Sequence, residues 1–177
     1  KPGLDQTDAL LAVTTISFDI AGLEIYLPLI TGATIVLSRR EQASDGASLI
    51  RVIQNSGATV MQATPITWRL MLEAGWDGTG LKKVLCGGEA FPVDLANQLS
   101  TTSAQIWNLY GPTETTIWST RYALSSAGAY DVSIPIGEPL NNTGLVLQDK
   151  FGNLMPAGLA GELFIGGKGL ANGYLNR

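Results

Sequence analysis

Through residue 124, short runs of apolar residues alternate with longer stretches in which apolar residues recur at helical spacing. The short runs predict strands, most of them buried on both faces, at 9–14, 33–38, 59–64, 81–86, 104–110 and 115–124. The longer stretches predict helices at 17–32, 46–56, 65–74 and 92–100. This alternation indicates right-handed βαβ units. The expected fold class is α/β, with a mostly parallel, Rossmann- or flavodoxin-like sheet flanked by helices.

Residues that start or stop helices set the expected boundaries. Ser17 and Asp45 can each cap the first turn of the helix that follows. Gly57 can close the second helix, and Pro65 fits the first turn of the third.

The pattern changes near Ile134. The stretches "TGLVLQD", "DKFGN" and "GELFIGG" predict short strands joined by turns rich in Asp, Asn and Gly. We therefore expect two units, an α/β core over residues 1–133 and a short β-rich segment over residues 134–177.

Composition narrows the class of protein. The chain has 177 residues, of which 45% are apolar and 15% charged, as in globular domains rather than disordered chains. A net charge of −4 argues against a nucleic-acid or anionic-membrane surface, because both need clustered Lys and Arg. The two adjacent basic pairs, Arg39-Arg40 and Lys82-Lys83, are expected in solvated turns.

The single cysteine, Cys86, and the absence of histidine exclude an internal disulfide, a multi-cysteine metal site and Ser-His or Cys-His catalysis. The expected compartment is the cytoplasm. Residues 20–37 have almost the length of a membrane span, but Glu24, Pro28 and Gly32 interrupt them. They are better interpreted as a buried helix followed by a buried strand, and no secretory signal is visible at the start.

Unusual residues follow four of the predicted strands. They are Phe18-Asp19, then Gln62 to Pro65, then Cys86 to Glu89, and finally Asn108 to Thr116. Ligands of open parallel sheets bind beyond the carboxyl ends of the strands. These four loops are therefore expected to form one pocket.

Asp19 begins an otherwise apolar helix and has two readings. An N-terminal carboxylate is favoured by the helix dipole, by a few tenths to about 1 kcal/mol. Alternatively, Asp19 is the counter-ion of a bound ammonium group. Such a pair at about 4 Å is worth roughly 4 kcal/mol before desolvation at an effective dielectric near 20.

The stretch "CGGEAF" also has two readings. Its glycines can serve a tight strand-to-helix turn, or they can leave a bare backbone surface against which a flat ring lies.

The stretch "NLYGPTETT", residues 108–116, points to a nucleotide phosphate and its metal. Tyr110 offers a face for a planar base, and Gly111-Pro112 fixes a turn whose amides can meet an anion. Thr113, Thr115 and Thr116 offer hydroxyl donors. Glu114 would repel phosphate directly, so a carboxylate here is expected to bind Mg²⁺ between them.

"NLYGPTETT" resembles the core motif of adenylate-forming enzymes, in particular the amino-acid adenylation domains of nonribosomal peptide synthetases. "SFDIAGLEIYLPLITGATIVL" and "GELFIGGKGLANGYLNR" are similar to two further motifs of those domains, in the same order. The resemblance covers essentially the whole chain. It departs at Asn172, where the family usually has Arg, in a turn with no assigned chemistry.

The resemblance implies a reaction and a set of roles. An amino acid and ATP would give aminoacyl-AMP and pyrophosphate, and the aminoacyl group would pass to the phosphopantetheine thiol of a carrier domain. Asp19 would hold the substrate ammonium, with main-chain oxygens near Gly111 and Ile117. The remaining roles are adenine contacts by Tyr110, Asn108, Gly87 and Gly88, an α-phosphate contact by Thr113, and Mg²⁺ binding by Glu114.

By the same resemblance, nine residues would line the side-chain pocket: Asp19, Ile20, Leu23, Gln62, Leu85, Gly87, Leu109, Ile117 and Trp118. Only Asp19 and Gln62 among them are polar, and a polar substrate side chain left unpaired costs about 1–3 kcal/mol per group. The bulky members fill most of the space. Glycine is therefore the expected substrate, with alanine next, because packed atoms must move to admit a methyl group.

The resemblance also implies parts beyond both ends. A phosphate-gripping loop should precede Lys1, and a ribose-binding aspartate and a mobile domain with a catalytic lysine should follow Arg177. Residues 134–177 would begin a β-barrel-like subdomain. Residues 1–177 alone are expected to show little or no turnover, and the parent synthetase should supply carrier and condensation domains for peptide antibiotic or other secondary-metabolite biosynthesis.

Three alternatives remain open. An acyl- or aryl-CoA ligase shares the Tyr-Gly-x-Thr-Glu core, but a buried Asp19 would be costly in an acyl pocket. A non-catalytic binding module would bind AMP without turnover. A nicotinamide-dependent oxidoreductase is disfavoured, because no Gly-x-Gly-x-x-Gly follows the first strand.

Overall fold

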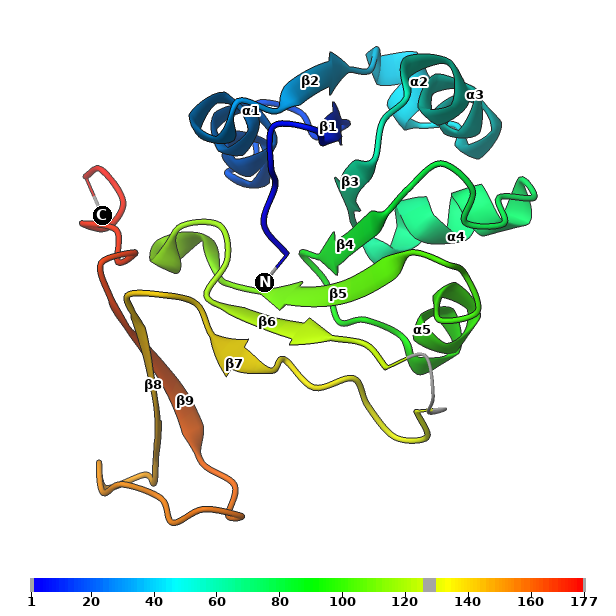
Figure 1. Cartoon of the computed structure of the whole chain (residues 1–177). Coiled ribbons are helices and arrows are strands. Elements are labelled where there is room, and N and C mark those ends of the chain that lie inside the picture. Colours follow the sequence, from blue (N-terminus) through cyan, green and yellow to red (C-terminus); the bar gives the residue numbers. More distant parts are fainter. Residues whose placement is uncertain (1, 126–129, 177) are drawn as a thin grey trace.

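A computed structural model describes residues 2–125 and 130–176, and its α/β body is built on one twisted sheet (Figure 1). Within those residues the sheet has seven strands in the order β2-β1-β3-β4-β5-β6-β7. The strands are β1 (Ala9–Ala12), β2 (Thr34–Leu37), β3 (Val60–Ala63), β4 (Lys83–Gly87), β5 (Gln105–Tyr110), β6 (Thr120–Ala123) and β7 (Glu138–Pro139). The helices are α1 (Ile20–Thr31), α2 (Arg40–Ala43), α3 (Gly46–Ser56), α4 (Pro65–Glu73) and α5 (Val93–Leu99).

The predicted mostly parallel sheet is confirmed. β1 pairs in parallel with both β2 and β3, and β4 and β5 continue the parallel order. β6 and β7 are added antiparallel. The order 2-1-3-4-5 reverses direction between β1 and β3, and in open α/β sheets the ligand binds at such a switch point.

Alternating side chains of the central strands build two cores, as expected for strands covered on both faces. Leu11, Met61 and Val84 pack with residues of α3, α4 and α5 on one face. Leu10, Val60 and Leu85 pack with Trp118 and α1 on the other. Figure 1 shows α3, α4 and α5 on one side of the sheet and α1 on the opposite side. The α1 face is the one that carries Asp19.

Helix boundaries follow the expected signals with one correction. The carboxylate of Asp45 accepts the Ser48 N–H at 2.7 Å, and Pro65 is the first residue of α4, as predicted. α1, however, begins at Ile20 with Asp19 as its N-cap residue, so the prediction that Ser17 caps it was wrong. The backbone from Thr15 to Asp19 forms tight turns that delay the helix.

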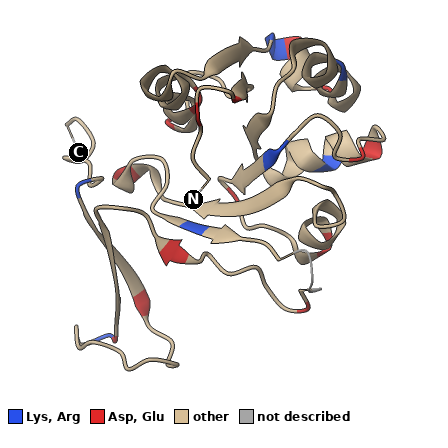
Figure 2. Cartoon of the chain, viewed as in Figure 1, with Lys and Arg blue, Asp and Glu red and all other residues tan. Residues whose placement is uncertain are grey.

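The basic pairs do not both lie in solvated turns. Arg40 opens the short helix α2, and Lys83 lies within β4. The Lys83 ammonium is 2.8 Å from Oδ2 of Asp8, whose side chain is 2% exposed. Burial raises the pKa of Asp8, but hydrogen bonds from Lys83, Asp5 and Thr59 outweigh it, so the pKa lies below its ordinary value. Figure 2 shows that Lys and Arg are otherwise scattered over separate elements.

The run at 115–124 does not form one strand. Thr113–Thr115 form a turn of 3₁₀-helix, and the strand β6 begins only at Thr120. Between them the chain turns through two left-handed residues, described below, which no strand can contain.

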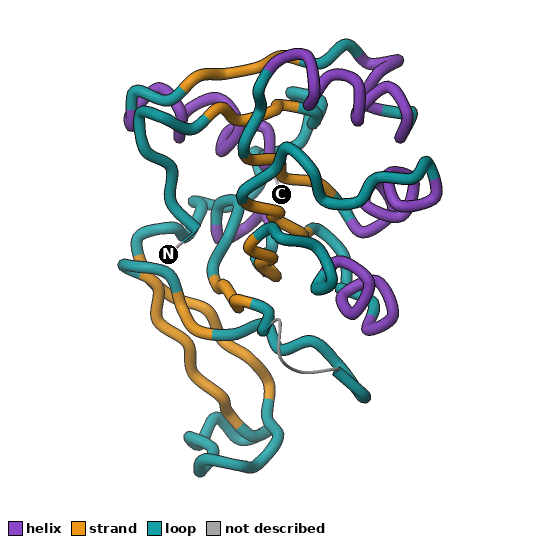
Figure 3. Tube along the Cα trace, turned by 45° about the vertical axis from the view of Figure 1, so that its right-hand side comes forward, coloured by secondary structure: helices purple, strands orange, loops and turns teal. Residues whose placement is uncertain are grey.

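Beyond β7, two of the three predicted short strands form the hairpin β8 (Thr143–Gln148) and β9 (Glu162–Gly167). The third stretch, "DKFGN", forms a turn instead, in which the Gly152 N–H donates to the carbonyl oxygen of Asp149 at 3.1 Å. Figures 1 and 3 show this hairpin projecting from the α/β body. Ile134 is buried in the core beside α5, and β7 pairs with β6, so residues 134–139 contact the larger sheet. The division into two domains at residues 133 and 134 stays a prediction. None of the described helices is long and apolar enough to cross a membrane.

Cys86 is expected to resist thiol reagents in the folded protein. Burial raises the pKa of its thiol far above the ordinary value, and the nearby Glu89 charge adds to the shift. The side chain is fully buried in β4. Ellman's reagent at pH 8 should label the thiol only after urea unfolds the chain. Rapid labelling without urea would contradict this packing.

Candidate functional site

Four loops meet at the carboxyl ends of the parallel strands and enclose a cavity of about 510 Å³, here called the aspartate cavity. Every loop singled out in the sequence contributes to its lining: Phe18, Asp19, Ile20, Gln62, Ala63, Thr64, Gly87, Gly88, Glu89, Gly111, Pro112, Thr113 and Trp118. The topology thus brings together residues up to a hundred positions apart in the sequence, from Phe18 to Trp118.

Asp19 occupies the N-cap position of α1 but does not cap that helix with its side chain. Its Oδ2 instead accepts the backbone N–H of Ile117 at 3.3 Å. A carboxylate that does not cap its own helix and lines a ligand-sized cavity is available to a cation there. This geometry favours the counter-ion reading over the helix-cap reading.

The chain opposite Asp19 is held in an uncommon conformation. Thr116 and Ile117 have φ values of 63° and 66°, although both are β-branched. Such residues in the left-handed region are strained and persist only where the surroundings impose them. Gly111 makes this possible, since a Cβ there would lie 2.6 Å from the carbonyl oxygen of Ile117. The strained turn therefore presents main-chain groups of Ile117 beside Asp19.

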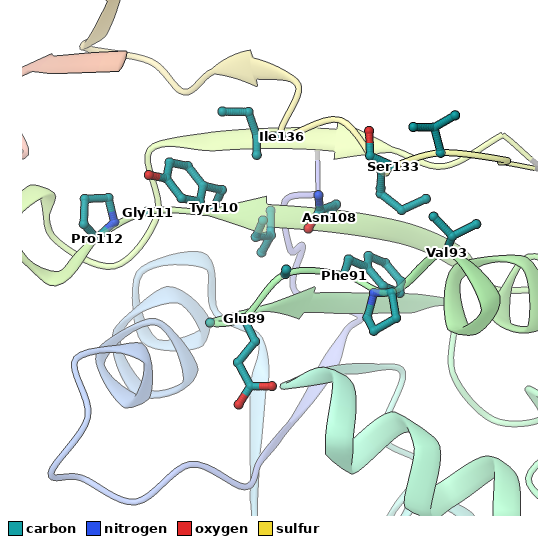
Figure 4. A pocket seen from close by; sticks show the side chains of 15 residues that line it. Glu89, Phe91, Val93, Asn108, Tyr110, Gly111, Pro112, Ser133 and Ile136 are labelled. Carbon is teal, nitrogen blue, oxygen red and sulfur yellow. The ribbon is translucent and has the colours of Figure 1, made fainter. Parts of the chain in front are cut away.

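A second cavity, of about 730 Å³, adjoins the first and is here called the tyrosine cavity (Figure 4). Figure 4 shows Tyr110, Gly111 and Pro112 at one end of it and Phe91, Val93 and Ser133 at the other. The two cavities share four lining residues: Gly88, Glu89, Gly111 and Pro112. A ligand with two parts can therefore occupy both.

Asn108 and Tyr110 lie as expected along the tyrosine cavity, at the end of β5. Tyr110 is 38% exposed and offers its ring to the cavity. The Asn108 side chain is buried, and its amide donates to the carbonyl oxygen of Pro135 at 2.8 Å. Asn108 therefore ties the 133–136 segment to β5 and shapes that wall.

The two glycines after β4 are required by close contacts. A Cβ on Gly87 would lie 2.5 Å from the indole of Trp118 and from the carbonyl oxygen of Leu109. Gly88 has a φ of 85°, which disfavours other residues. The tight-turn reading fits these contacts. Gly88 lines both cavities and Gly87 lines the aspartate cavity, and that a flat ring lies against this backbone stays a prediction.

Leu23, Leu85 and Leu109 do not line the aspartate cavity. They lie behind Trp118, around a smaller apolar cavity of about 310 Å³, here called the rear cavity. Trp118 lines both this cavity and the aspartate cavity, and Leu109 also lines the tyrosine cavity. That these leucines line the substrate pocket stays a prediction. Ile117 also lies outside the lining and acts through its backbone.

Glu114 lies at the surface beside the aspartate cavity. Its carboxylate has a hydrogen-bond partner, Tyr174, that the sequence did not indicate. The hydroxyl of Tyr174 donates to Oε1 of Glu114 at 3.0 Å. This bond raises the pKa of Tyr174, and the charges of Glu114 and Asp19 add to the shift. Asp19 lines the aspartate cavity together with Thr113, the residue next to Glu114, so both carboxylates lie on the same side of the molecule. The only sequence signal for Tyr174 was its place in "LANGYLNR".

The hydroxyls around Glu114 divide into two groups. Thr113 lines the aspartate cavity. Thr115 is buried and shares a 2.6 Å hydrogen bond with Ser119, and Thr116 donates to the carbonyl oxygen of Gly169 at 2.6 Å. The expectation that Thr115 and Thr116 serve a ligand was wrong, since both hydroxyls fix the strained turn.

The donor set around Glu114 suits a metal that arrives with its ligand. Among the described residues, no group of three or more acidic, His or Cys side chains could hold a metal ion by itself. A carboxylate has about four lone-pair sites, so Glu114 can accept from Tyr174 and still bind a hard cation. Mg²⁺ is commonly held by one or two carboxylates together with phosphate oxygens and water. Glu114 fits that pattern.

Glu24 is the second residue whose role the sequence did not reveal. It is fully buried in α1, and its carboxylate accepts the N–H groups of Val13 and Thr14 at 3.0 and 2.9 Å and the Thr14 hydroxyl at 2.7 Å. Burial raises the pKa of Glu24 above its ordinary value, although these bonds oppose the shift. Glu24 fixes the chain that leaves β1 toward Asp19.

Comparison with known families and proteins identifies the family of this chain. The family described as AMP-binding enzyme matches residues 1–175. A dimodular nonribosomal peptide synthase of Bacillus subtilis is 44% identical over 98% of this chain, and tyrocidine synthase 3 of Brevibacillus parabrevis is 42% identical over 98%. The chain spans only 7% and 3% of the length of these two relatives.

Two solved structures are similar over nearly the whole chain. A four-domain nonribosomal peptide synthetase with AMP and glycine bound is 43% identical, with a TM-score of 0.89 over 98% of this chain and 13% of that one. The N-terminal subdomain of NpsA from Klebsiella oxytoca, in complex with 3-hydroxybenzoyl-AMSN, is 28% identical. Its TM-score is 0.85 over 97% of this chain and 44% of that one.

Proposed function

Because the chain belongs to the AMP-binding enzyme family, we propose that it forms the core of an amino-acid adenylation domain in a nonribosomal peptide synthetase. In this proposal the domain joins an amino acid to AMP with release of pyrophosphate. The aminoacyl group then passes to the phosphopantetheine thiol of a carrier domain. Carrier and condensation domains of the same synthetase are the proposed partners, and the cytoplasm is the proposed compartment.

The observation that carries this proposal is the orientation of Asp19. Its carboxylate leaves its own helix uncapped and lies at the wall of a cavity that continues into the tyrosine cavity. An amino acid presents an ammonium group, which needs an acidic partner, and its carboxylate must face the nucleotide. Asp19 can bind the first while the second points toward Thr113.

The neighbouring residues suit a nucleotide. Adenine would lie in the tyrosine cavity against Tyr110, with Gly88 and Asn108 along its edge and Gly87 next to it in the wall of the aspartate cavity. Thr113 would donate to the α-phosphate, and Glu114 would bind Mg²⁺. When bound, the metal neutralises phosphate charge. The protein's own contribution is to hold the two reacting groups together and to orient them.

Glycine is the proposed substrate and alanine the nearest competitor. Trp118 is 7% exposed and occupies the space beyond Asp19, with Ile20 beside it. A side chain longer than a methyl group would have to displace this indole. The related four-domain synthetase has glycine and AMP bound, which supports the same choice.

Amino-acid-dependent exchange of pyrophosphate into ATP tests the proposal. A complete adenylation domain that contains residues 1–177 is expected to catalyse this exchange with glycine, more weakly with alanine and not with large amino acids. Residues 1–177 by themselves are expected to show no exchange, since the resemblance places the catalytic lysine elsewhere. Preference for a large substrate would contradict the glycine assignment, and no exchange with any amino acid by the complete domain would contradict the function.

One alternative has a specific observation in its favour. The similar subdomain of NpsA is in complex with an aryl-acyl compound, so this fold also accepts ligands without an ammonium group. An aryl or acyl acid would leave the Asp19 carboxylate without a counter-ion. Activity with benzoate-type acids and none with amino acids would favour that alternative.

A further inference from the structure

Gln62 lies on β3 in the wall of the aspartate cavity and is 1% exposed. We propose that Gln62 is a positioning residue that sets the size of the accepted amino acid by holding the indole of Trp118 as the end wall of the cavity. In this proposal Gln62 makes no polar contact with the substrate. The inference rests on the proposed function and extends it to the origin of substrate size selection.

Both polar atoms of the Gln62 side chain are already hydrogen-bonded within the protein, so Gln62 has little remaining capacity to bond a ligand. Its Oε1 accepts the indole N–H of Trp118 at 2.7 Å, and its Nε2 donates to the carbonyl oxygen of Ile20 at 3.3 Å. An indole nitrogen is only a donor, which fixes the oxygen of the Gln62 amide toward Trp118. The amide nitrogen then faces α1, where it also lies close enough to Glu24 to favour the ionised carboxylate.

The surroundings of Trp118 show why its orientation needs a polar anchor. The indole separates two spaces, the aspartate cavity in front and the rear cavity behind it. The rear cavity is lined mostly by apolar side chains, among them Leu23, Leu85 and Leu109, with Arg121 and Asn141 also in its lining. The leucines pack against the indole but offer it no hydrogen-bond acceptor. A side chain between two open spaces can turn toward either. The hydrogen bond to Gln62 holds the indole in the position that limits the length of the aspartate cavity.

The backbone beneath the indole fits the same position. A Cβ on Gly87 would lie 2.5 Å from the Trp118 ring, so the ring packs directly on the end of β4. Gln62, Leu85 and Gly87 point to the same face of the sheet, because Gln62 pairs with Leu85 in the parallel register. Removal of the Gln62 acceptor would leave the buried indole N–H unpaired and free the ring to turn into the rear cavity. The aspartate cavity would then admit larger substrate side chains.

The test is a two-by-two set of variants in a complete adenylation domain that contains this chain: Gln62→Met, Trp118→Phe and both together. Methionine keeps the length of glutamine and removes the acceptor. Gln62→Met is expected to lower the glycine-to-alanine ratio of kcat/KM roughly 2- to 10-fold, the range of one neutral hydrogen bond, through a lower KM for alanine. In the Trp118→Phe background, the same change should have no further effect on the ratio.

The matched control is Gln54→Met, on the exposed face of α3, which should leave the ratio unchanged. A second measurement, the NMR signal of the Trp118 indole, detects the hydrogen bond without depending on enzyme activity. The indole ¹H–¹⁵N signal of Trp118, identified by its loss in Trp118→Phe, should move upfield in Gln62→Met and stay in place in Gln54→Met.

Three results would overturn the inference: an unmoved indole signal, an unchanged ratio in an active Gln62→Met domain, or an equal effect in both backgrounds. The last would mean that Gln62 contacts the substrate directly. If Gln62→Met fails to fold, Trp118→Phe tests the same hydrogen bond by removing its donor, the indole N–H. This variant should lower the glycine-to-alanine ratio of kcat/KM by a similar factor. Absence of amino-acid-dependent exchange in the unmodified domain would instead overturn the proposed function, and this inference with it.

Discussion

Asp19→Ala is expected to reduce amino-acid-dependent pyrophosphate exchange by roughly 100- to 1,000-fold in a complete domain that contains this chain. The reason is the loss of the substrate's counter-ion, which is worth roughly 4 kcal/mol before desolvation. The effect should fall on kcat/KM, measured with glycine at saturating ATP. Exchange supported by an acid without an ammonium group should hardly change.

The matched control is Asp45→Ala. Asp45 is also an N-cap aspartate, but its side chain bonds to the Ser48 N–H at 2.7 Å and so caps its own helix. Its loss should cost about 1 kcal/mol of stability and leave the exchange rate unchanged. Equal activity of the Asp19→Ala and unmodified domains would show that the ammonium group binds elsewhere.

Glu24→Leu is expected to lower the free energy of unfolding by about 3–5 kcal/mol, the second largest effect predicted for this chain. The substitution leaves the N–H groups of Val13 and Thr14 without their acceptor inside the protein. Glu24→Gln keeps one oxygen for both groups and should cost no more than about 1–2 kcal/mol. Urea denaturation of residues 1–177, followed by tryptophan fluorescence, measures the difference.

The pH dependence gives a second measure of Glu24. Its pKa is raised on folding, so the folded state binds this proton more tightly than the unfolded state. The contribution of Glu24 to stability is therefore largest below pH 4.5 and is lost as the pH rises through the folded-state pKa. The stability of Glu24→Gln relative to the unmodified chain should increase over that range. A difference that stays constant with pH would contradict the raised pKa.

The sequence was sufficient for features that depend on local pattern and topology. The buried strands, the parallel order and the meeting of four loops at one edge follow from apolar runs and βαβ connections, and the Asp45 cap follows from its residue type. The site's long-range contacts do not follow in this way. Nothing in the sequence around Gln62 indicates that its amide oxygen accepts a hydrogen bond from Trp118, 56 positions later.

The same limit explains the errors. Ile117 and Trp118 continue an apolar run and so predict a strand, yet Thr116 and Ile117 adopt a left-handed conformation that their side chains disfavour. Contacts with Asp19, Gly111 and Gly169 impose it. Glu24 looked like an interruption in an apolar segment, because its partners Val13 and Thr14 lie on the other side of a turn.

The left-handed pair has a consequence for attempts to redesign this site. Glu114 and Trp118 lie on either side of Thr116 and Ile117, so the candidate metal ligand and the end wall share one kinked segment of main chain. A substitution at Thr116 or Ile117 would disturb the kink and carry that disturbance both to the Glu114 carboxylate and to the Trp118 wall. Changes at Gln62, Leu23 or Leu85, which approach the indole from other elements, leave the kink intact and offer the safer route to a new substrate range.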